Sequence, residues 1–300
     1  MILAFCMSND KLVMNWQQLT TPDVIGDTNS NLFGEIVQET VALTRRLFIQ
    51  LQRRPSSLIA GIIQPVMWLV LFGALFQNAP KGLFGSTSNY GQFLAAGVIV
   101  FTAFAGALNA GLPVMFDREF GFLNRLLVAP LGSRFSIVFA SAIFIISQSL
   151  LQAAVIVAAA AFLGAGLPDF TGLCAIALIV FLLALGVTAI SLGLAFALPG
   201  HIELIAVIFV TNLPLLFAST ALAPLSFMPG WLQVIATLNP LSYAIEPIRY
   251  LYLHSSWGLN NIVMHAFWGD VTFGSALLVL LGFALFALLS IQSQIRRSLA

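Results

Sequence analysis

Six long blocks of apolar residues, none of which contains Asp, Glu, Lys or Arg, constrain the fold of this chain more than any other feature. A helix that crosses a bilayer needs about 20 mostly apolar residues, because lipid offers no hydrogen bonds to its backbone and no solvation to charged side chains. Each block reaches that length. The sequence therefore predicts an all-α polytopic membrane protein with six transmembrane helices, at about 57–76, 92–115, 135–163, 172–198, 204–223 and 271–291.

The composition agrees with this class. Hydrophobic residues make up 60% of the chain and charged residues only 8%, whereas a soluble domain carries about 25% charged residues. The net charge of +1 leaves no basic surplus to neutralise phosphates, so no nucleic-acid partner is expected. Two cysteines exclude a disulfide framework. The three histidines are too scattered to converge on a metal ion, so no metal site is expected either.

The basic residues fall on one side of the predicted spans. With the N-terminus inside the cell, ten of the twelve Lys and Arg residues lie in cytoplasmic segments, and only Lys81 and Arg249 lie outside. Because positive charge near span ends stays on the cytoplasmic side, we expect a multi-pass protein of a cell membrane, of the bacterial inner-membrane type, with both termini in the cytoplasm. Residues 1–30 are expected to form a flexible cytoplasmic tail ahead of a transmembrane domain at 31–300.

Apolar residues recur every three or four positions between residues 31 and 54, just before the first span. A helix with one apolar stripe and a basic end is typical of the membrane surface, so we expect an amphipathic surface helix here. An ordinary positive-inside anchor explains its arginines equally well. The charged residues that mark this segment are Glu39, Arg45, Arg46, Arg53 and Arg54.

Residues 116–134, FDREFGFLNRLLVAPLGSR, concentrate scarce charge between the second and third spans. Under the predicted topology this segment is cytoplasmic. Phe120, Leu123, Leu126 and Leu127 have helical spacing, and Pro130 ends the pattern. We expect a short docking helix that fits a groove on another protein, with a merely helical positive-inside loop as the alternative.

The segment 224–270, before the last span, is apolar but is interrupted by prolines. It holds three of the five Trp residues, which favour the lipid headgroup zone. We therefore expect a half-immersed element at the outer face. Glu246 and Arg249 are three residues apart and can pair on a helix. The sequence leaves two roles open for this pair: a structural clamp and a contact with substrate.

Three separated runs resemble one family. DREFGFLNRLLVAPLGSR is similar to the cytoplasmic loop of type-2 ABC-transporter permeases, where an acidic-Arg-Glu start, a Gly and an R-L-L-V-x-P-L run recur. ALTRRLFIQLQRRPSSLIAGIIQPVMWLVLFGALF resembles the start of the drug-export branch, and MPGWLQVIATLNPLSYAIEPIRYL resembles the segment before the last span. The resemblance covers nearly all of residues 31–297, although Phe122 and Asn124 depart from the family's usual residues.

The resemblance implies the transmembrane permease subunit of an ATP-driven exporter that moves an amphipathic substrate (a drug-like compound, a lipid or a glycolipid) out of the cytoplasm. It implies two protein partners besides membrane lipid: a second permease subunit, in a homodimer or heterodimer, and a separate ABC ATP-binding subunit that uses ATP and Mg. The chain itself has no Gly-Lys pair, and hence no G-x-x-x-x-G-K-[ST] phosphate loop. We therefore expect a transport subunit that binds no cofactor and is not itself an enzyme.

The resemblance also implies roles for particular residues. It makes the loop after the second span a coupling helix, and the surface helix an elbow beside the ATPase. It implies two short re-entrant helices in the outer segment, hinged near Asn239 and Pro240, with Trp231, Glu246 and Arg249 among them. The residues to which we assign ATPase coupling are Asp117, Arg118, Glu119, Gly121, Arg125 and Pro130.

Two other classes of membrane protein, secondary transporters and intramembrane enzymes, fit the same residues less well. A secondary transporter driven by an ion gradient usually carries carboxylates or histidines deep within its spans, and the six predicted spans contain no Asp or Glu. An intramembrane enzyme needs converging Ser-His, Asp-Asp or metal-binding pairs inside the bilayer, and the spans show none. The secondary transporter is the alternative that we retain.

Overall fold

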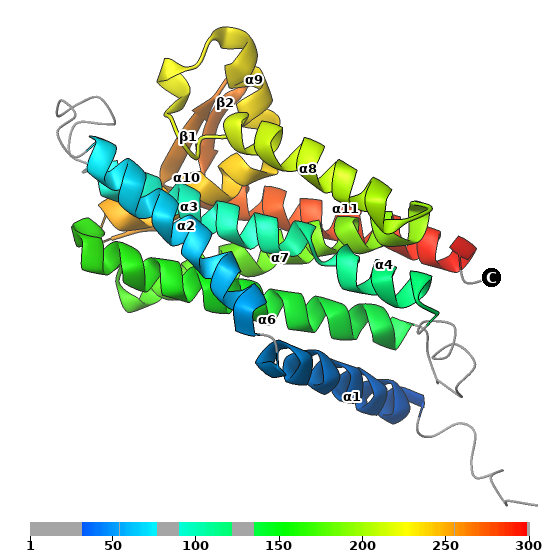
Figure 1. The fold of residues 1–300 in the computed structure, drawn as a ribbon. Coiled ribbons are helices and arrows are strands. Elements are labelled where there is room, and N and C mark those ends of the chain that lie inside the picture. Colours follow the sequence, from blue (N-terminus) through cyan, green and yellow to red (C-terminus); the bar gives the residue numbers. More distant parts are fainter. Residues whose placement is uncertain (1–31, 54, 77–89, 122–134, 255, 299–300) are drawn as a thin grey trace, which may run out of the picture.

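The computed structural model describes residues 32–53, 55–76, 90–121, 135–254 and 256–298, and these residues are almost entirely helical. Figure 1 shows a bundle of long helices with a first helix, α1, beside one end. A group of short helices and a β-hairpin lies at the opposite end. The predicted all-α polytopic architecture is confirmed for the spanning part of the molecule.

The first half of the chain forms four of the described helices. Pro55 opens α2 at a position where its missing N–H has no helical partner to lose. The predicted second span is divided by a turn at Asn109–Ala110, where the Asn109 side chain donates to the Ala105 carbonyl over 2.7 Å. These elements are α1 (Leu32–Arg53), α2 (Pro55–Phe76), α3 (Tyr90–Leu108) and α4 (Gly111–Glu119).

The second half supplies the remaining long helices and the short ones. α6 runs into a π-helical turn, Ala161–Ala165, and the glycines Gly164 and Gly166 then turn the chain with positive φ. The long helices are α6 (Phe135–Ala160), α7 (Phe170–Ala197), α8 (His201–Phe217) and α11 (Phe273–Ser298), and the short elements are a 3₁₀ turn (Leu225–Phe227), α9 (Gly230–Leu238), α10 (Pro240–Leu253), β1 (Ile262–Ala266) and β2 (Gly269–Thr272).

Five helical segments among the described residues are long and apolar enough to cross a membrane: Leu58–Phe76, Tyr90–Glu119, Ser136–Ala165, Phe170–Ala197 and Phe273–Ile291. The predicted fifth span, 204–223, is wrong beyond residue 217, because α8 ends at Phe217 after 17 residues. At 1.5 Å per residue α8 is about 26 Å long, slightly short of a hydrocarbon core of about 30 Å. The last span also begins later than predicted, because Val271 lies in β2.

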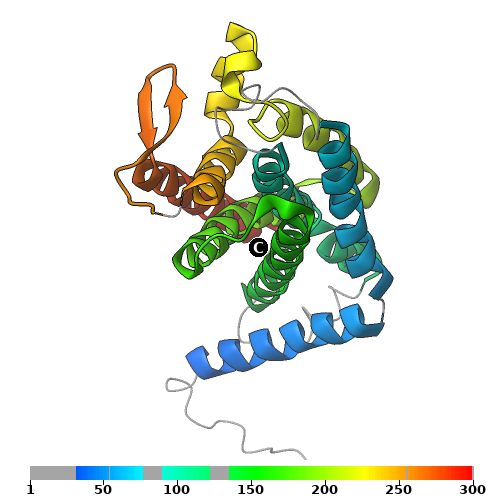
Figure 2. The same ribbon diagram turned by 90° about the vertical axis from the view of Figure 1, so that its left-hand side faces the viewer.

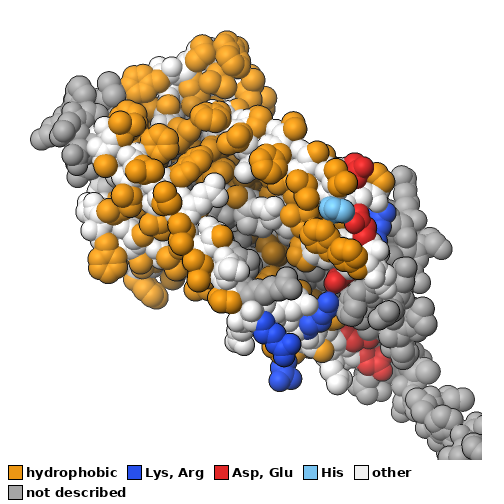
Figure 3. All heavy atoms as spheres, viewed as in Figure 1, with side chains coloured by type: hydrophobic (Ala, Val, Ile, Leu, Met, Phe, Trp, Pro, Cys, Tyr) orange, Lys and Arg blue, Asp and Glu red, His pale blue; other side chains and the backbone are white. Residues whose placement is uncertain are grey.

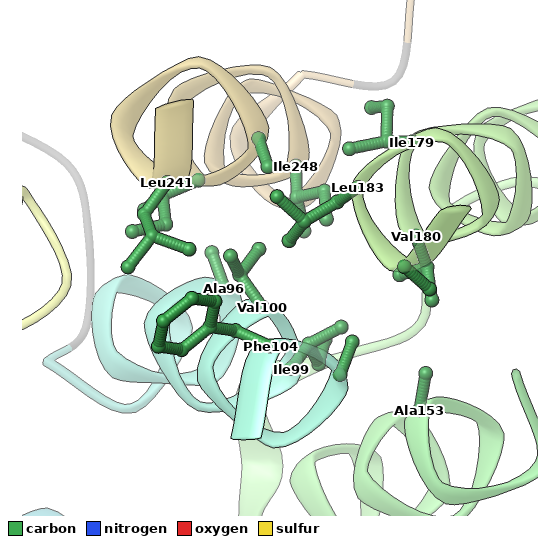
Figure 4. Packing of buried hydrophobic residues seen from close by; sticks show 14 of the residues in the cluster. Ala96, Ile99, Val100, Phe104, Ala153, Ile179, Val180, Leu183, Leu241 and Ile248 are labelled. Atoms are coloured by element: carbon green, nitrogen blue, oxygen red, sulfur yellow. The ribbon is translucent and has the colours of Figure 1, made fainter. Parts of the chain in front are cut away.

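The core forms where α3 and α7 meet α6, α10 and α11. Small side chains allow this close approach, among them Ala103, Ala107 and Gly111 at four-residue spacing. Ala103 and Ala107 are fully buried, and a Cβ on Gly111 would lie 2.5 Å from the Ser191 carbonyl oxygen of α7. Figure 4 shows α3 residues directed toward α7 and α10; the labelled side chains include Ile99, Val100, Ile179, Leu183, Leu241 and Ile248.

A two-stranded antiparallel hairpin, β1–β2, follows α10 and was missed by the all-α prediction. Its turn holds Phe267 and Trp268, and Gly269 enters β2 with φ +135°, a conformation that side chains other than glycine rarely adopt. The strands are only five and four residues long. Their pattern is therefore too short to stand out from the apolar sequence around it.

The face of the molecule seen in Figure 3 divides into an apolar region and a charged end. Figure 3 shows hydrophobic side chains over most of the visible face, and charged side chains gathered at the end near α1, α4 and α8. In Figure 2, α1 lies across the lower edge of the bundle. Side chains on α2 and α8 remain widely exposed, including Leu75 (70%) and Phe209 (73%). Such a surface suits lipid or another apolar subunit rather than water.

Candidate functional site

The charged run that opens the predicted docking helix lies at the end of α4, where three consecutive side chains bind three separate parts of the chain. The first of them, Asp117, places Oδ2 3.4 Å from Arg46 Nη1 of α1. Both side chains are about one-third exposed, at 34% and 32%. Solvent screens such a pair, so it contributes little to the stability of the fold, but it links α1 to α4.

Arg118 binds the end of α7. Its Nη1 donates to the carbonyl oxygens of Ala195 and Leu198, each over 3.0 Å, and lies 3.5 Å from that of Phe196. The last four carbonyls of a helix have no partner within the helix, and they carry the negative end of its dipole. A guanidinium therefore satisfies these groups and complements their charge at the same time.

Glu119 binds the start of α8. It accepts a hydrogen bond of 2.6 Å from the His201 backbone N–H, and its other oxygen lies 2.5 Å from His201 Nδ1. The N-cap residue of α8 is Gly200, which has no side chain to cap the helix. A Cβ on Gly200 would lie 3.0 Å from Glu119 Oε1, so the absence of a side chain admits the carboxylate. A negative charge here complements the positive end of the α8 dipole.

These contacts form what we term the α4 junction: Asp117, Arg118 and Glu119 with Arg46, His201 and the α7 carbonyls. The expectation that these three charges sit on a separate docking helix is wrong, because they are the last residues of α4 and bind within the chain. Gly121, with φ +74°, turns the chain after α4. Arg125 and Pro130, with most of the predicted docking helix, lie outside the described residues.

The predicted surface helix, α1, is tied to α6 as well as to α4. Glu39 Oε2 accepts a hydrogen bond of 2.8 Å from Ser136 Oγ in the first turn of α6. Its apolar stripe packs on the bundle, and the Phe48 ring meets Phe144 of α6 edge-on at 5.2 Å. Arg45 and Arg53 are exposed, and Arg54 lies outside the described residues.

The outer segment contains the two short helices that the resemblance implied, with the break at Asn239–Pro240. Asn239, 4% exposed, serves both helix ends that meet there. Its Oδ1 accepts from the Leu241 N–H over 3.0 Å and so caps α10, while its Nδ2 donates to the Leu215 and Ala218 carbonyls at the end of α8. Trp231 on α9 is 68% exposed.

The predicted pair of Glu246 and Arg249 forms on α10, with 2.5 Å between Oε1 and Nη1. Arg249 is 6% exposed, and it also donates to the Thr220 carbonyl over 2.6 Å. Its guanidinium lies 3.7 Å from the centre of the Phe93 ring of α3. Arg249 thus joins α10, α3 and the turn after α8, an arrangement that favours the clamp over a contact with substrate.

The partners of these residues were the part of the site that sequence reasoning missed. Arg118 and Glu119 bind groups 77 to 82 positions away along the chain. No local pattern encodes such a pairing. Only a general signal was present in the sequence. A positive charge suits the C-terminal end of a helix and a negative charge suits the N-terminal end, so adjacent opposite charges at the end of a span can bind one end of each kind.

Comparison with known proteins identifies the chain. The family described as ABC-2 type transporter matches residues 38–253. The putative transport permease ycf38 of Porphyra purpurea is 58% identical over 255 residues, which cover 85% of this chain and 88% of the relative. Its counterpart in Cyanophora paradoxa is 57% identical, over 83% of this chain and 86% of the relative.

More distant relatives are drug-resistance permeases. The probable doxorubicin resistance ABC transporter permease DrrC of Mycobacterium tuberculosis is 26% identical over 71% of this chain and 76% of its own. The daunorubicin resistance ABC transporter permease DrrB1 of Streptomyces coeruleorubidus is 27% identical over 75% of this chain and 78% of its own. The family match covers well over half of the chain, so this protein belongs to the ABC-2 type transporter family and is a multi-pass membrane permease of an ABC transporter.

Proposed function

We propose that this permease exports an amphipathic substrate from the cytoplasm with energy from a separate ATP-binding subunit, and that the α4 junction carries the motion of that subunit into the spans. The chain has no phosphate-binding Gly-Lys loop, so nucleotide hydrolysis belongs to the partner. The names of the more distant relatives, which refer to doxorubicin and daunorubicin resistance, support a drug-like substrate.

The α4 junction is the observation that carries the proposal. The segment that leaves α4 continues into the predicted coupling helix, where the ATP-binding subunit docks. A displacement of that segment pulls on Glu119 and Arg118 first. These side chains are bonded to the start of α8 and the end of α7, and Asp117 is paired with α1. The three elements therefore move with α4 as one unit.

A second permease subunit completes the proposed transporter. The side chains that α2 and α8 leave exposed are large and apolar, such as Leu71, Leu75, Phe209 and Val210. A neighbouring permease would cover them, and rotation of each α4 unit against its partner would open the path for substrate. Under this proposal the charged end is cytoplasmic, in agreement with the predicted positive-inside orientation.

Reconstitution with the ATP-binding subunit tests the proposal. Vesicles that contain both subunits should accumulate the neutral amphipathic dye Nile red only with ATP, and Glu119→Gln should lower the dye moved per ATP hydrolysed. Glu35→Gln is the matched control, because Glu35 is an exposed residue of the first turn of α1. Accumulation by the permease alone, or an unchanged ratio in Glu119→Gln, would contradict the proposal.

A further inference from the structure

A cavity of about 630 Å³ lies between α1, α2, α3, α4 and α6, and Asn212 of α8 also lines it. It is separate from the α4 junction: none of the junction residues lines it. Under the proposed orientation α2 enters the membrane at Pro55, so Gln64 lies about 14 Å along the helix from the cytoplasmic end. The cavity is therefore in the cytoplasmic half of the bilayer.

Amide side chains line this cavity at a depth where the surrounding sequence is almost wholly apolar. Five come from three helices and one turn: Gln64 on α2, Gln148 and Gln152 on α6, Asn109 after α3 and Asn212 on α8. Gln50 of the surface helix α1 is the sixth. Polar groups inside a membrane protein are costly and mark sites of function. Six amides around one cavity therefore point to a ligand that forms hydrogen bonds.

Gln152 is the most firmly held of these amides. Its side chain is 3% exposed and packs where Gly61 of α2 and Gly106 of α3 leave room. A Cβ added at Gly61 would lie 2.5 Å from Gln152 Nε2, and a Cβ added at Gly106 would lie 3.3 Å from Gln152 Oε1. Two glycines on neighbouring helices thus make a slot for one amide that lines the cavity.

Asn109 and Thr102 of the cavity wall bond to backbone carbonyls, but other polar groups of this region lack partners within the part of the chain that the structure describes. No hydrogen bond joins Gln152, Gln148 or Gln64 to any described residue. Two further buried oxygens, Asn212 Oδ1 and Ser149 Oγ, are also unpaired among these residues. A buried polar group without a partner destabilises the protein, and a ligand with matching donors and acceptors would relieve that cost.

The rest of the wall is apolar and aromatic. The Trp68 ring stacks on the Phe101 ring, with centroids 5.6 Å apart and planes within 12°. Phe144 lines the same cavity from α6. None of the lining residues is charged. An ionic ligand would therefore lose its hydration here without gaining a counter-charge.

We infer that this cavity binds an uncharged, planar amphiphile whose carbonyl, hydroxyl or amide groups pair with Gln152, Gln148 and Asn212 while its rings pack beside Trp68. The inference rests on the proposed function, because it names the substrate class of the same transporter. It restricts that class to neutral molecules, which the apolar composition of the spans alone does not do.

Dye binding to the full chain in lipid nanodiscs, without nucleotide or ATP-binding subunit, tests the inference. Nile red is neutral and planar and carries a carbonyl, whereas Nile blue has a similar ring system with a positive charge. Nile red should bind saturably above the signal of empty nanodiscs, and Nile blue should not. Gln152→Leu and Gln148→Leu should each raise the Kd for Nile red about five- to tenfold, the usual effect of one lost hydrogen bond.

Two further variants make the test decisive. Ala105 lines the cavity, so Ala105→Trp should fill it and abolish saturable binding. Gln38→Leu makes the same chemical change at an exposed position of α1 outside the cavity and should leave the Kd unchanged. Equal binding of both dyes, or wild-type Nile red binding in Ala105→Trp and Gln152→Leu, would overturn the inference.

The outcome is distinguishable from a failure of the proposed function. Saturable Nile red binding that Ala105→Trp removes, together with no ATP-driven transport by the wild-type complex, would reject the export proposal and leave the cavity as a binding site. ATP-driven transport with wild-type dye binding in Ala105→Trp would reject the cavity alone.

Discussion

Replacement of Arg118 by Met tests the α4 junction at its centre. Methionine keeps much of the length and packing of the side chain but removes the donors to the Ala195 and Leu198 carbonyls, each now bonded over 3.0 Å. Hydrogen bonds to a charged group each contribute about 1.5–3 kcal/mol when buried. Arg118 is half-buried, and one of its nitrogens serves all the carbonyls, so we expect these bonds together to contribute about 2 kcal/mol. Their loss would raise the equilibrium constant for local opening by a factor of about 30.

Amide hydrogen exchange on the full chain measures that opening. In Arg118→Met, peptides that cover residues 194–204, at the α7–α8 connection, should lose about 30-fold of their protection, while peptides of α10 keep theirs. Arg118→Lys retains a positive charge near the negative end of the α7 dipole, so its protection at residues 194–204 should lie between those of the wild type and Arg118→Met. Wild-type protection at 194–204 in Arg118→Met would refute the claim that this side chain holds α7 to α4.

Three other variants test neighbouring contacts. In Arg46→Asp the amount of dye moved per ATP hydrolysed should fall, and adding Asp117→Arg should restore part of it. The effect should be modest, because the ion pair is worth less than about 1 kcal/mol. Equal amounts of dye per ATP in the single and double variants would show that the pair has no role in coupling. Arg249→Met should lower the free energy of unfolding by about 3–5 kcal/mol, because it leaves the largely buried Glu246 without its partner. Adding Glu246→Gln should recover part of the resulting fall in Tm. An unchanged Tm in Arg249→Met would show that this pair does not act as a clamp. Asn239→Ala should cost about 1–3 kcal/mol by freeing the carbonyls at the end of α8, measured as a fall in Tm, and Asn239→Asp, which keeps the acceptor that caps α10 but also lacks the donor, should cost at least as much; a clearly smaller loss in Asn239→Asp would assign the effect to the cap of α10 instead.

The spans were predictable because the bilayer imposes a simple requirement. A helix in lipid must be about 20 residues long and nearly free of charge, so length and composition locate α2, α6 and α7 to within a few residues. The hinge of the outer segment had local signals too. Asn239 precedes Pro240, and this pair of residues is favoured at the N-cap and first position of a helix.

The end of α8 and the hairpin were not predictable in the same way. The sequence remains apolar from Phe217 to Ala223, so hydropathy cannot show that Asn239, over twenty residues later, binds the α8 carbonyls and ends the helix. The hairpin is short, and its turn at Phe267–Trp268 lacks the Asn-Gly or Asp-Gly pair that usually marks one. Both features depend on contacts distant in sequence.

The cavity shows a different limit. Most of its amides are visible in the sequence as polar residues within apolar spans. A lone Gln or Asn in a span has many explanations, and only packing reveals that Gln64, Gln152 and Asn212 surround the same space. Amides that recur at similar depths in several predicted spans are the signal that sequence reasoning can use.

Cross-linking of α1 to α4 tests most directly the claim that the α4 junction moves as one unit. Cysteines in place of Arg46 and Asp117, in a chain without Cys6 and Cys174, would be joined by a short reducible bis-thiosulfonate reagent and reconstituted with the ATP-binding subunit. The account predicts that the cross-linked transporter moves dye with ATP at least as well as the same sample after reduction. Transport that stops on cross-linking and returns on reduction would contradict it.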